Sequence, residues 1–175
     1  QQSSVVSTLP MHIRKSTIHD LPSIPGLIEE GRQKMISEGN TTQWTNGHPS
    51  LPQIEHDIAH GVSYMVTDGE RPVATFALIE GPDPTYAKIY EGQWGNSLPY
   101  YVIHRVASAP GVHGIMRQVL EYAFSLTGTI RIDTHQDNRT MRALLQKYGF
   151  TYCGIILLEN GDPRLAYQRT KTSAE

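Results

Sequence analysis

Apolar positions in the second half of the chain follow first a strand pattern and then a helical one. LPYYVIHRVAS (98–108) is rich in β-branched and aromatic residues and is apolar on both faces, which predicts an interior strand. Pro110 and Gly111 interrupt this pattern. Apolar residues then recur at helical spacing, so we expect a helix that begins near Gly114 and carries Ile115, Met116, Val119, Leu120, Ala123 and Phe124 on one face.

A second strand and a second helix follow the first pair. TIRIDT (129–134) alternates between polar and apolar residues, which predicts a half-buried strand. The next apolar residues are spaced as i, i+3, i+4 and i+7, which is typical of one helix face: Met141, Leu144, Leu145 and Tyr148. We expect Asp137 to cap this helix and Gly149 to end it.

Two hairpins are predicted by Gly-containing turns between apolar runs. Asp68-Gly69 separates VSYMVT from PVATFALI, and Asn160-Gly161 separates FTYCGIILL from RLAYQR. HIRKS, directly after Met11, predicts another strand. Residues 80–97 mix acidic, aromatic and turn-forming residues, so we expect an irregular segment that is too aromatic to be an idle linker.

Helical patterns in the first half run from Pro25 to about Gly39 and over residues 51–60, with a loop at 40–50 between them. The order of elements predicts an α/β (α+β) fold: a mixed, mostly antiparallel central sheet of about seven strands with helices on both faces. We expect a single domain over residues 11–170. Residues 1–10 are interpreted as a leader or disordered arm, and residues 171–175 as a frayed tail.

Composition narrows the functional classes. The 15 basic and 17 acidic residues give a formal net charge of −2, which indicates no broad basic surface for nucleic acid. The N-terminus lacks the pattern of a secretory signal, and no apolar run approaches the length of a membrane span. The single cysteine, Cys153, cannot form an internal disulfide. We therefore expect a cytoplasmic protein with neither nucleic acid nor a membrane as partner.

Two blocks of sequence carry a resemblance to a known family. They are HRVASAPGVHGIMRQVLEYAF and IRIDTHQDNRTMRALLQKYGFTYCG. This part of the chain resembles the GNAT superfamily of acyl-CoA-dependent N-acyltransferases, in which the first block is the strand, pyrophosphate loop and helix that hold coenzyme A. The second block matches the family's Asn-bearing helix and the Gly-Phe pair that follows it, here Asn138 and Gly149-Phe150. The order of elements resembles the family over residues 13–169.

The resemblance implies acetyl-CoA as co-substrate and no metal. Backbone groups of Val106 and Ser108 would bind the pantetheine arm in a gap between residues 106–108 and 130–134. A glycine turn that leads into a helix presents unpaired N–H groups and the positive end of a helix dipole, which suits a phosphate. The other implied cofactor contacts come from that turn, its helix and the following helix: Val112, His113, Gly114, Ile115, Met116, Arg117, Asn138 and Met141.

Five of these residues also have an ordinary structural interpretation. Val106 and Ser108 would then pair only within the sheet, and Arg117 would be a solvated surface residue. Asn138 would be a capping residue, and Met141 would pack in the core.

Transfer of an acetyl group to an amine requires a neutral amine and a proton for the leaving thiolate. Four residues are candidates for this proton transfer: Glu80, His104, Tyr148 and Cys153. Histidine titrates near neutrality, which suits His104, and Glu80 ends the third strand at the mouth of the expected site. Tyr148 and Cys153 lie near the expected thiolate position in sequence. The alternative for each of the four is a purely structural role.

Aromatic residues before and within the interior strand are candidates for the wall of an acceptor pocket: Tyr86, Tyr90, Trp94 and Tyr101, with Tyr100 beside them. The alternative is that half of them pack the sheet. His56 and His60 are four residues apart on a predicted helix, a spacing that can chelate zinc. Because no third ligand is evident, two surface histidines are the favoured interpretation.

We therefore expect an N-acetyltransferase that moves an acetyl group from acetyl-CoA to a primary amine of a small-molecule or amino-acid-like acceptor, by direct attack in a ternary complex. A homodimer is expected at the level of the family. The alternative is a catalytically weak CoA-binding or ligand-sensing module of the same fold. It is motivated by Gly111 and Met116, which replace the family's Arg or Gln and its Gly or Ala, and by Leu145 in place of a common tyrosine.

Overall fold

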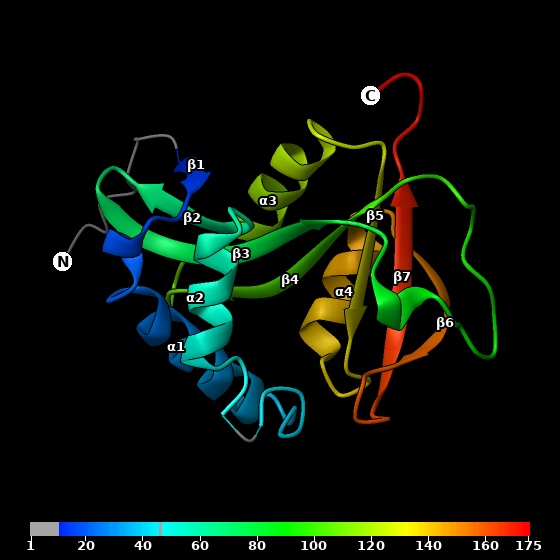
Figure 1. Ribbon diagram of the computed structural model, residues 1–175, viewed down its shortest axis with the longest axis horizontal. Helices are drawn as coiled ribbons and strands as arrows, with labels where there is room; N and C mark the ends of the chain where they lie inside the picture. The colour runs from blue at the N-terminus through cyan, green and yellow to red at the C-terminus, as the bar shows by residue number, and fades with distance from the viewer. Residues whose placement is uncertain (1–10, 46) are drawn as a thin grey trace, which may run out of the picture.

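The computed structural model describes residues 11–45 and 47–175, so the expected leader at 1–10 lies outside the described residues. Seven strands form one sheet in the order β1-β2-β3-β4-β5-β7-β6 (Figure 1). They are β1 (Met11–Lys15), β2 (Ser63–Asp68), β3 (Arg71–Glu80), β4 (Tyr101–Ser108), β5 (Thr129–Thr134), β6 (Thr151–Leu157) and β7 (Pro163–Thr170). β4 and β5 are parallel and the other neighbouring pairs are antiparallel, which confirms the predicted mixed sheet.

Helices cover both faces of this sheet, as predicted. They are α1 (Ile24–Ser37), α2 (Leu51–Ala59), α3 (Ile115–Phe124) and α4 (Arg139–Lys147), with short 3-10 turns η1 (Ile18–Asp20) and η2 (Pro84–Tyr86). α1 and α2 pack against Met65 and Ala107 on one face. α3 and α4 pack on the other face, in a larger core that includes Phe76 and Ile132. Figure 1 shows α1 and α2 together below β2 and β3, and α3 above them.

Three local predictions differ from the structure. The interior strand begins at Tyr101 rather than at residue 98, because Pro99 has no N–H group for the ladder. β5 is almost fully buried rather than half-buried, since α4 packs on one side and residues 81–97 on the other. Asn138, not Asp137, is the N-cap of α4: its Oδ1 accepts the Met141 N–H at 3.1 Å.

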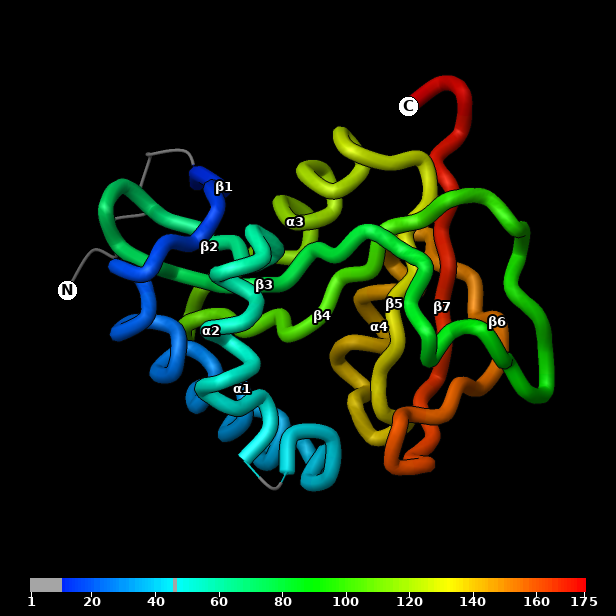
Figure 2. The backbone as a smooth tube through the Cα atoms, in the orientation of Figure 1, coloured from blue at the N-terminus to red at the C-terminus, as the bar shows by residue number. Residues whose placement is uncertain are grey.

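The sheet divides between its two central strands. β4 and β5 are paired only where Tyr101 meets Ile130 and Val102 meets Arg131. Beyond these pairs the strands separate, and Figure 2 shows β4 turning toward β1–β3 while β5 runs beside β7. The gap therefore opens within the expected region, but Ile130 and Arg131 still pair and do not line it.

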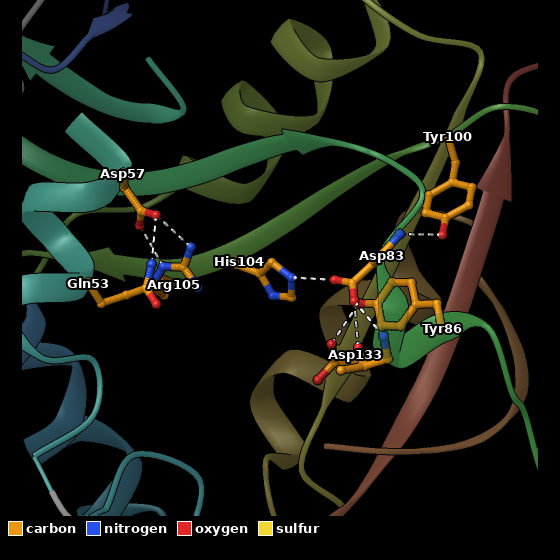
Figure 3. A network of polar contacts seen from close by, with 9 residues as sticks. Gln53, Asp57, Asp83, Tyr86, Tyr100, His104, Arg105 and Asp133 are labelled. Atoms are coloured by element: carbon orange, nitrogen blue, oxygen red, sulfur yellow. Dashed lines mark hydrogen bonds and ion pairs between the residues drawn. The ribbon is translucent and has the colours of Figure 1, made fainter. Parts of the chain in front are cut away.

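A β-bulge in β4 lies beside the gap. The β3–β4 register shifts between Thr75 and Ala77, and Arg105 opposite this shift has a φ of 55°. A positive φ is uncommon for a residue with a side chain and needs support from its surroundings. The bulge turns Arg105 toward α2, where it meets Asp57 (Figure 3).

Residues 81–97 cross the face of β5, β7 and β6 that α4 leaves open. The ring of Tyr86 is 2% exposed and packs with Val102, Ile156 and Ala166. Tyr90 forms an antiparallel bridge with Ile155, with both N···O distances 2.8 Å. The backbone passes so close to β6 that a Cβ on Gly92 would overlap the Cys153 carbonyl. This irregular segment is thus fixed to the sheet.

Candidate active site

A cavity of about 560 Å³ occupies the gap between β4 and β5. Four parts of the chain enclose it: the α1–α2 loop, the start of the 81–97 segment, the beginning of α4 and the β6–β7 turn. Its polar lining is dominated by ionisable and amide side chains, namely Gln43, His48, Gln53, Asp83, His104, Arg105, Asp133, Asn138, Glu159, Asn160, Asp162 and Arg164. Ile103, Val106, Ile132 and Met141 contribute apolar surface.

His104 and Asp83 form a hydrogen-bonded pair in this cavity. The His104 Nε2 lies 3.3 Å from Asp83 Oδ2, and the other oxygen of Asp83 accepts the Thr85 N–H and hydroxyl at 2.9 and 2.7 Å. Burial acts to raise the pKa of Asp83, but the hydrogen bonds from His104 and Thr85 outweigh it and lower that pKa below its ordinary value. Asp83 is therefore ionised near neutral pH and can only accept from His104, which leaves Nδ1 of a neutral imidazole without a proton.

Two further pairs flank His104 and Asp83, and Figure 3 shows them on either side. Tyr86 donates its hydroxyl to Asp133 Oδ2 at 2.6 Å, and burial, reinforced by the charge of Asp133, raises the pKa of Tyr86 well above its ordinary value. On the other side Arg105 donates to both oxygens of Asp57, at 2.7 and 3.0 Å. Gln53 also donates to Asp57, at 2.9 Å. These contacts attach both flanks of the cavity to β4 and β5.

The α1–α2 loop closes one side of the cavity through Gln43. Its Oε1 lies 2.9 Å from Asn40 Nδ2, 3.1 Å from Asn138 Nδ2 and 3.3 Å from the His135 N–H. Thr42 adds a contact of 2.8 Å from its hydroxyl to His135 Nε2. Asn138 is thus engaged at both ends of its side chain, by Met141 and by Gln43.

The turn before α3 has the backbone geometry of a potential anion site. Gly114 is the N-cap of α3 with a φ of 78°, and a Cβ at this position would meet nothing within 4 Å. The first intrahelical hydrogen bond is donated by Gln118 to the Gly114 carbonyl, so the N–H groups of Ile115, Met116 and Arg117 precede it. These N–H groups thus have no intrahelical partner, which is the arrangement that binds anions at helix N-termini.

The backbone of β4 presents further donors toward the gap. The Ala109 N–H donates to the Val73 carbonyl at 2.8 Å, on the β3 side. Because N–H groups alternate between the two edges of a strand, the Ala107 amide shares that edge and the amides of Val106 and Ser108 face β5. β5 has already separated from β4 there, so these amides are available to a bound molecule.

The four proton-transfer candidates lie in different places. His104 lines the cavity. Glu80 is exposed at the end of β3, where its backbone pairs with Tyr101. Tyr148 lies in another groove, between α3 and residues 169–175. Cys153 is buried in β6, and burial raises the pKa of its thiol. The structure brings only His104 of this set into the cavity.

The cofactor candidates form two groups. Val106, Asn138 and Met141 line the cavity, whereas residues 112–117 lie at the turn and first turn of α3. Within this turn the Val112 N–H is already bound to the Ala109 carbonyl at 3.3 Å, and the Met116 side chain is buried in the core. Arg117 is exposed and 3.4 Å from Glu121. The turn therefore offers backbone N–H groups, with the exposed guanidinium of Arg117 beside them.

The aromatic acceptor candidates do not line the cavity. Tyr86 and Trp94 belong to the 81–97 segment and pack in the small core between this segment and the sheet. The Trp94 indole donates to the Tyr86 carbonyl at 2.9 Å. Tyr90 is 46% exposed beside β6, and Tyr101 packs against the α3 side of the core. The cavity wall combines polar and apolar side chains, and the sequence pattern missed Asp83, Asp133 and Arg164 there. Their signal was weak because a single charged residue in a loop or strand has many ordinary roles.

His56 and His60 stack with ring centroids 3.8 Å apart on α2. Within residues 11–45 and 47–175, no group of three His, Cys, Asp or Glu side chains is arranged to hold a metal ion. Among the helices of the same residues, none is both long and apolar enough to cross a membrane.

The split sheet, the glycine turn before α3 and the cavity between β4 and β5 define an α/β protein of the acyltransferase type. A GNAT-family acetyltransferase from Streptococcus agalactiae 2603 is 31% identical, over 93% of this chain and 96% of that one, with a TM-score of 0.80. A GNAT-family acetyltransferase from Listeria monocytogenes 4b F2365 is 20% identical over 95% and 99%, with a TM-score of 0.69. The NatC complex bound to Gag peptide and CoA contains a chain that is 12% identical over 94% and 100%, with a TM-score of 0.61. No protein-family model and no curated protein matches the sequence.

The identity and coverage of the streptococcal protein are sufficient to assign the family. This chain belongs to the GNAT family of acetyltransferases, as the resemblance of its two sequence blocks predicts.

Proposed function

We propose that the protein is an N-acetyltransferase that moves the acetyl group of acetyl-CoA to a primary amine of a small acceptor by direct attack. The observation that carries this proposal is the hydrogen-bonded His104–Asp83 pair inside the gap between β4 and β5. A general base needs an unprotonated atom within reach of the reacting group, and Nδ1 of His104 would be that atom when Nε2 donates to Asp83.

Residues of this chain fit coenzyme A at two points. The N–H groups of Ile115, Met116 and Arg117, with the helix dipole behind them, would bind the pyrophosphate at the turn where Gly114 leaves space. The amides of Val106 and Ser108 would bind the pantetheine arm in the gap. When bound, acetyl-CoA supplies the acetyl group as a thioester.

In this proposal the acceptor reacts as a neutral amine. Its nitrogen bonds to the thioester carbonyl carbon, His104 Nδ1 accepts the proton that this nitrogen loses, and the C–S bond breaks. Asp83 holds the ring and stabilises the resulting imidazolium by a charge-assisted hydrogen bond, so it is a positioning residue. The protonated imidazole then carries the proton that the leaving sulfur requires. The ion pair between Arg105 and Asp57 holds the β4 bulge in place. His104 directly precedes Arg105 in this bulge, so the ion pair also helps to position His104.

The test is thiol release from acetyl-CoA across a panel of primary amines, combined with mass spectrometry of the products. Amine-dependent thiol release with N-acetylated product supports the proposal. Tight binding of CoA without turnover of any amine contradicts it and favours the CoA-binding module. That alternative is supported by Met116 and Leu145, because both are core residues at positions where the family carries other side chains.

A further inference from the structure

Arg164, at the start of β7, differs from buried Arg131 and half-buried Arg105. Arg105 is bound by Asp57, and Arg131 donates to Gln168 and to the Asn96 carbonyl while lying 4.1 Å from the ring centres of Trp94 and Tyr100. Arg164 is 6% exposed, yet among the described residues its side chain has one hydrogen bond, from Nη1 to the adjacent Pro163 carbonyl at 2.8 Å. Within residues 11–45 and 47–175 it has no carboxylate within the ion-pair limit of 4.0 Å.

Arg164 belongs to the wall of the cavity between β4 and β5. The only fully buried side-chain nitrogen or oxygen without a partner in the described residues is Asn40 Oδ1. Nε and Nη2 of Arg164 have no hydrogen-bond partner among the described residues, so neither of them is completely sealed from solvent. Burial lowers the pKa of Arg164, and the more distant carboxylates of Asp133 and Asp162 offset only part of that effect. A guanidinium that has lost most of its contact with water and has no carboxylate beside it is unfavourable, so a ligand carboxylate would complete this site.

The position of Arg164 relates this site to the proposed chemistry. Ala166 pairs with Asp133 of β5, and Arg164, two residues before Ala166, projects on the same face of β7. The cavity therefore contains a cation at Arg164 and carboxylates at Asp83, Asp133 and Asp162. Those carboxylates disfavour an acceptor with net negative charge, whereas one carboxylate with one ammonium group matches both signs.

We propose that Arg164 binds the carboxylate of the acceptor, and that the acceptors of this protein are amino acids. The inference rests on the proposed acetyl transfer and narrows its acceptor class. Two N–H donors of a guanidinium match the two oxygens of a carboxylate. An amine that lacks a carboxylate cannot form this pair of hydrogen bonds.

The test compares free amino acids with two analogues of each: the amine that lacks the α-carboxylate, and the α-amide, which keeps the shape without the charge. Acetyl transfer is measured as kcat/KM, and binding to the CoA-saturated protein is measured separately by calorimetry. The variants are Arg164→Gln and Arg164→Lys, with Arg71→Gln at the exposed β2–β3 turn as the matched control. Circular dichroism and CoA affinity check that each variant is native.

For at least one amino acid we expect wild-type kcat/KM or affinity to exceed that of both analogues by about 10- to 100-fold, the range of a charge-assisted hydrogen bond. Arg164→Gln should remove this preference, Arg164→Lys should keep part of it, and Arg71→Gln should leave it intact. Equal or better use of the analogues, or a preference that persists in Arg164→Gln, would overturn the inference. If no amine is acetylated, the proposed function fails, and the binding arm still decides whether Arg164 selects carboxylates. Absence of amino-acid binding would then overturn the inference as well.

Discussion

The imidazole of His104 on β4 and the carboxylate of Asp83 at the start of the 81–97 segment meet across the gap in the sheet, with 3.3 Å between Nε2 and Oδ2. Asp83 is fixed from two other directions. Its carboxylate accepts from Thr85, and its backbone N–H donates to the Tyr100 hydroxyl at 2.9 Å. These contacts fix Asp83 although it lies in an irregular segment. Asp83 in turn fixes the orientation of the His104 ring.

If His104 is the proton acceptor, His104→Ala should lower kcat by about 100-fold or more near neutral pH. Asp83→Asn should have a smaller effect, because it removes the carboxylate that orients the ring but leaves Nδ1 in place. Glu80→Gln, at an exposed carboxylate outside the cavity, is the control and should keep wild-type kcat. Steady-state kinetics over a range of pH tests this prediction: the acidic limb of the rate profile should disappear in His104→Ala. An unchanged profile in that variant would mean that the amine loses its proton to water.

Gly114→Val should prevent CoA binding. The substitution adds a branched side chain at the turn and strains a φ of 78°, with the N–H groups that would bind the pyrophosphate immediately after it. Gly39→Val is the matched control, because Gly39 has a φ of 88° and equally open surroundings at the end of α1. Both variants should lose stability, whereas only Gly114→Val should lose CoA affinity in a calorimetric titration. Wild-type affinity in folded Gly114→Val would remove the phosphate site from this turn.

Asn138→Ala should lower the free energy of unfolding by about 1 kcal/mol, the usual cost of a lost N-cap. Both ends of the Asn138 side chain contact the protein, so we expect little change in the KM for acetyl-CoA. Asn138→Asp keeps an acceptor for the Met141 N–H and should recover most of the stability. Denaturant unfolding and steady-state kinetics measure the two quantities. A much higher KM in a folded Asn138→Ala variant would instead assign the residue to the cofactor.

The elements were predictable because their signals are local. Helical spacing identified α3 and α4, and Asp68-Gly69 and Asn160-Gly161 identified both hairpins. Local signals did not decide between Asp137 and Asn138 as the cap of α4, since both residue types cap helices. Gln43 of the distant α1–α2 loop contacts Asn138 rather than Asp137.

The candidate site was less predictable because its contacts join residues far apart in sequence. Asp133 meets Tyr86 across 47 positions, and Arg105 meets Asp57 across 48. The aromatic residues of the 81–97 segment predicted the wall of an acceptor pocket. In the structure a buried ring such as that of Tyr86 packs on the sheet instead. The burial of Arg164 could not be predicted from the sequence, because it depends on the gap between β4 and β5 and on the β6–β7 turn.

Stability should depend on pH through Asp20. The hydrogen bond from Arg14, together with the Thr17 N–H, lowers the pKa of Asp20 below its ordinary value of 3.8 despite partial burial. The unfolded state therefore binds a proton at higher pH than the folded state. The contribution of Asp20 is complete above its unfolded pKa and is lost as the pH falls through its folded pKa. The difference in unfolding free energy between wild type and Asp20→Asn should shrink in this acidic range, and a difference independent of pH there would contradict this account. Arg14→Gln should weaken the same dependence.

A crystal structure of the protein with acetyl-CoA tests the central claim most directly, namely that the gap between β4 and β5 is where the thioester and the acceptor meet. We expect the pyrophosphate against the N–H groups of Ile115, Met116 and Arg117, the pantetheine arm beside Val106 and Ser108, and the thioester in the cavity that His104 lines. Acetyl-CoA bound in another groove, such as the one between α3 and residues 169–175, or with its thioester out of reach of His104, would contradict the account.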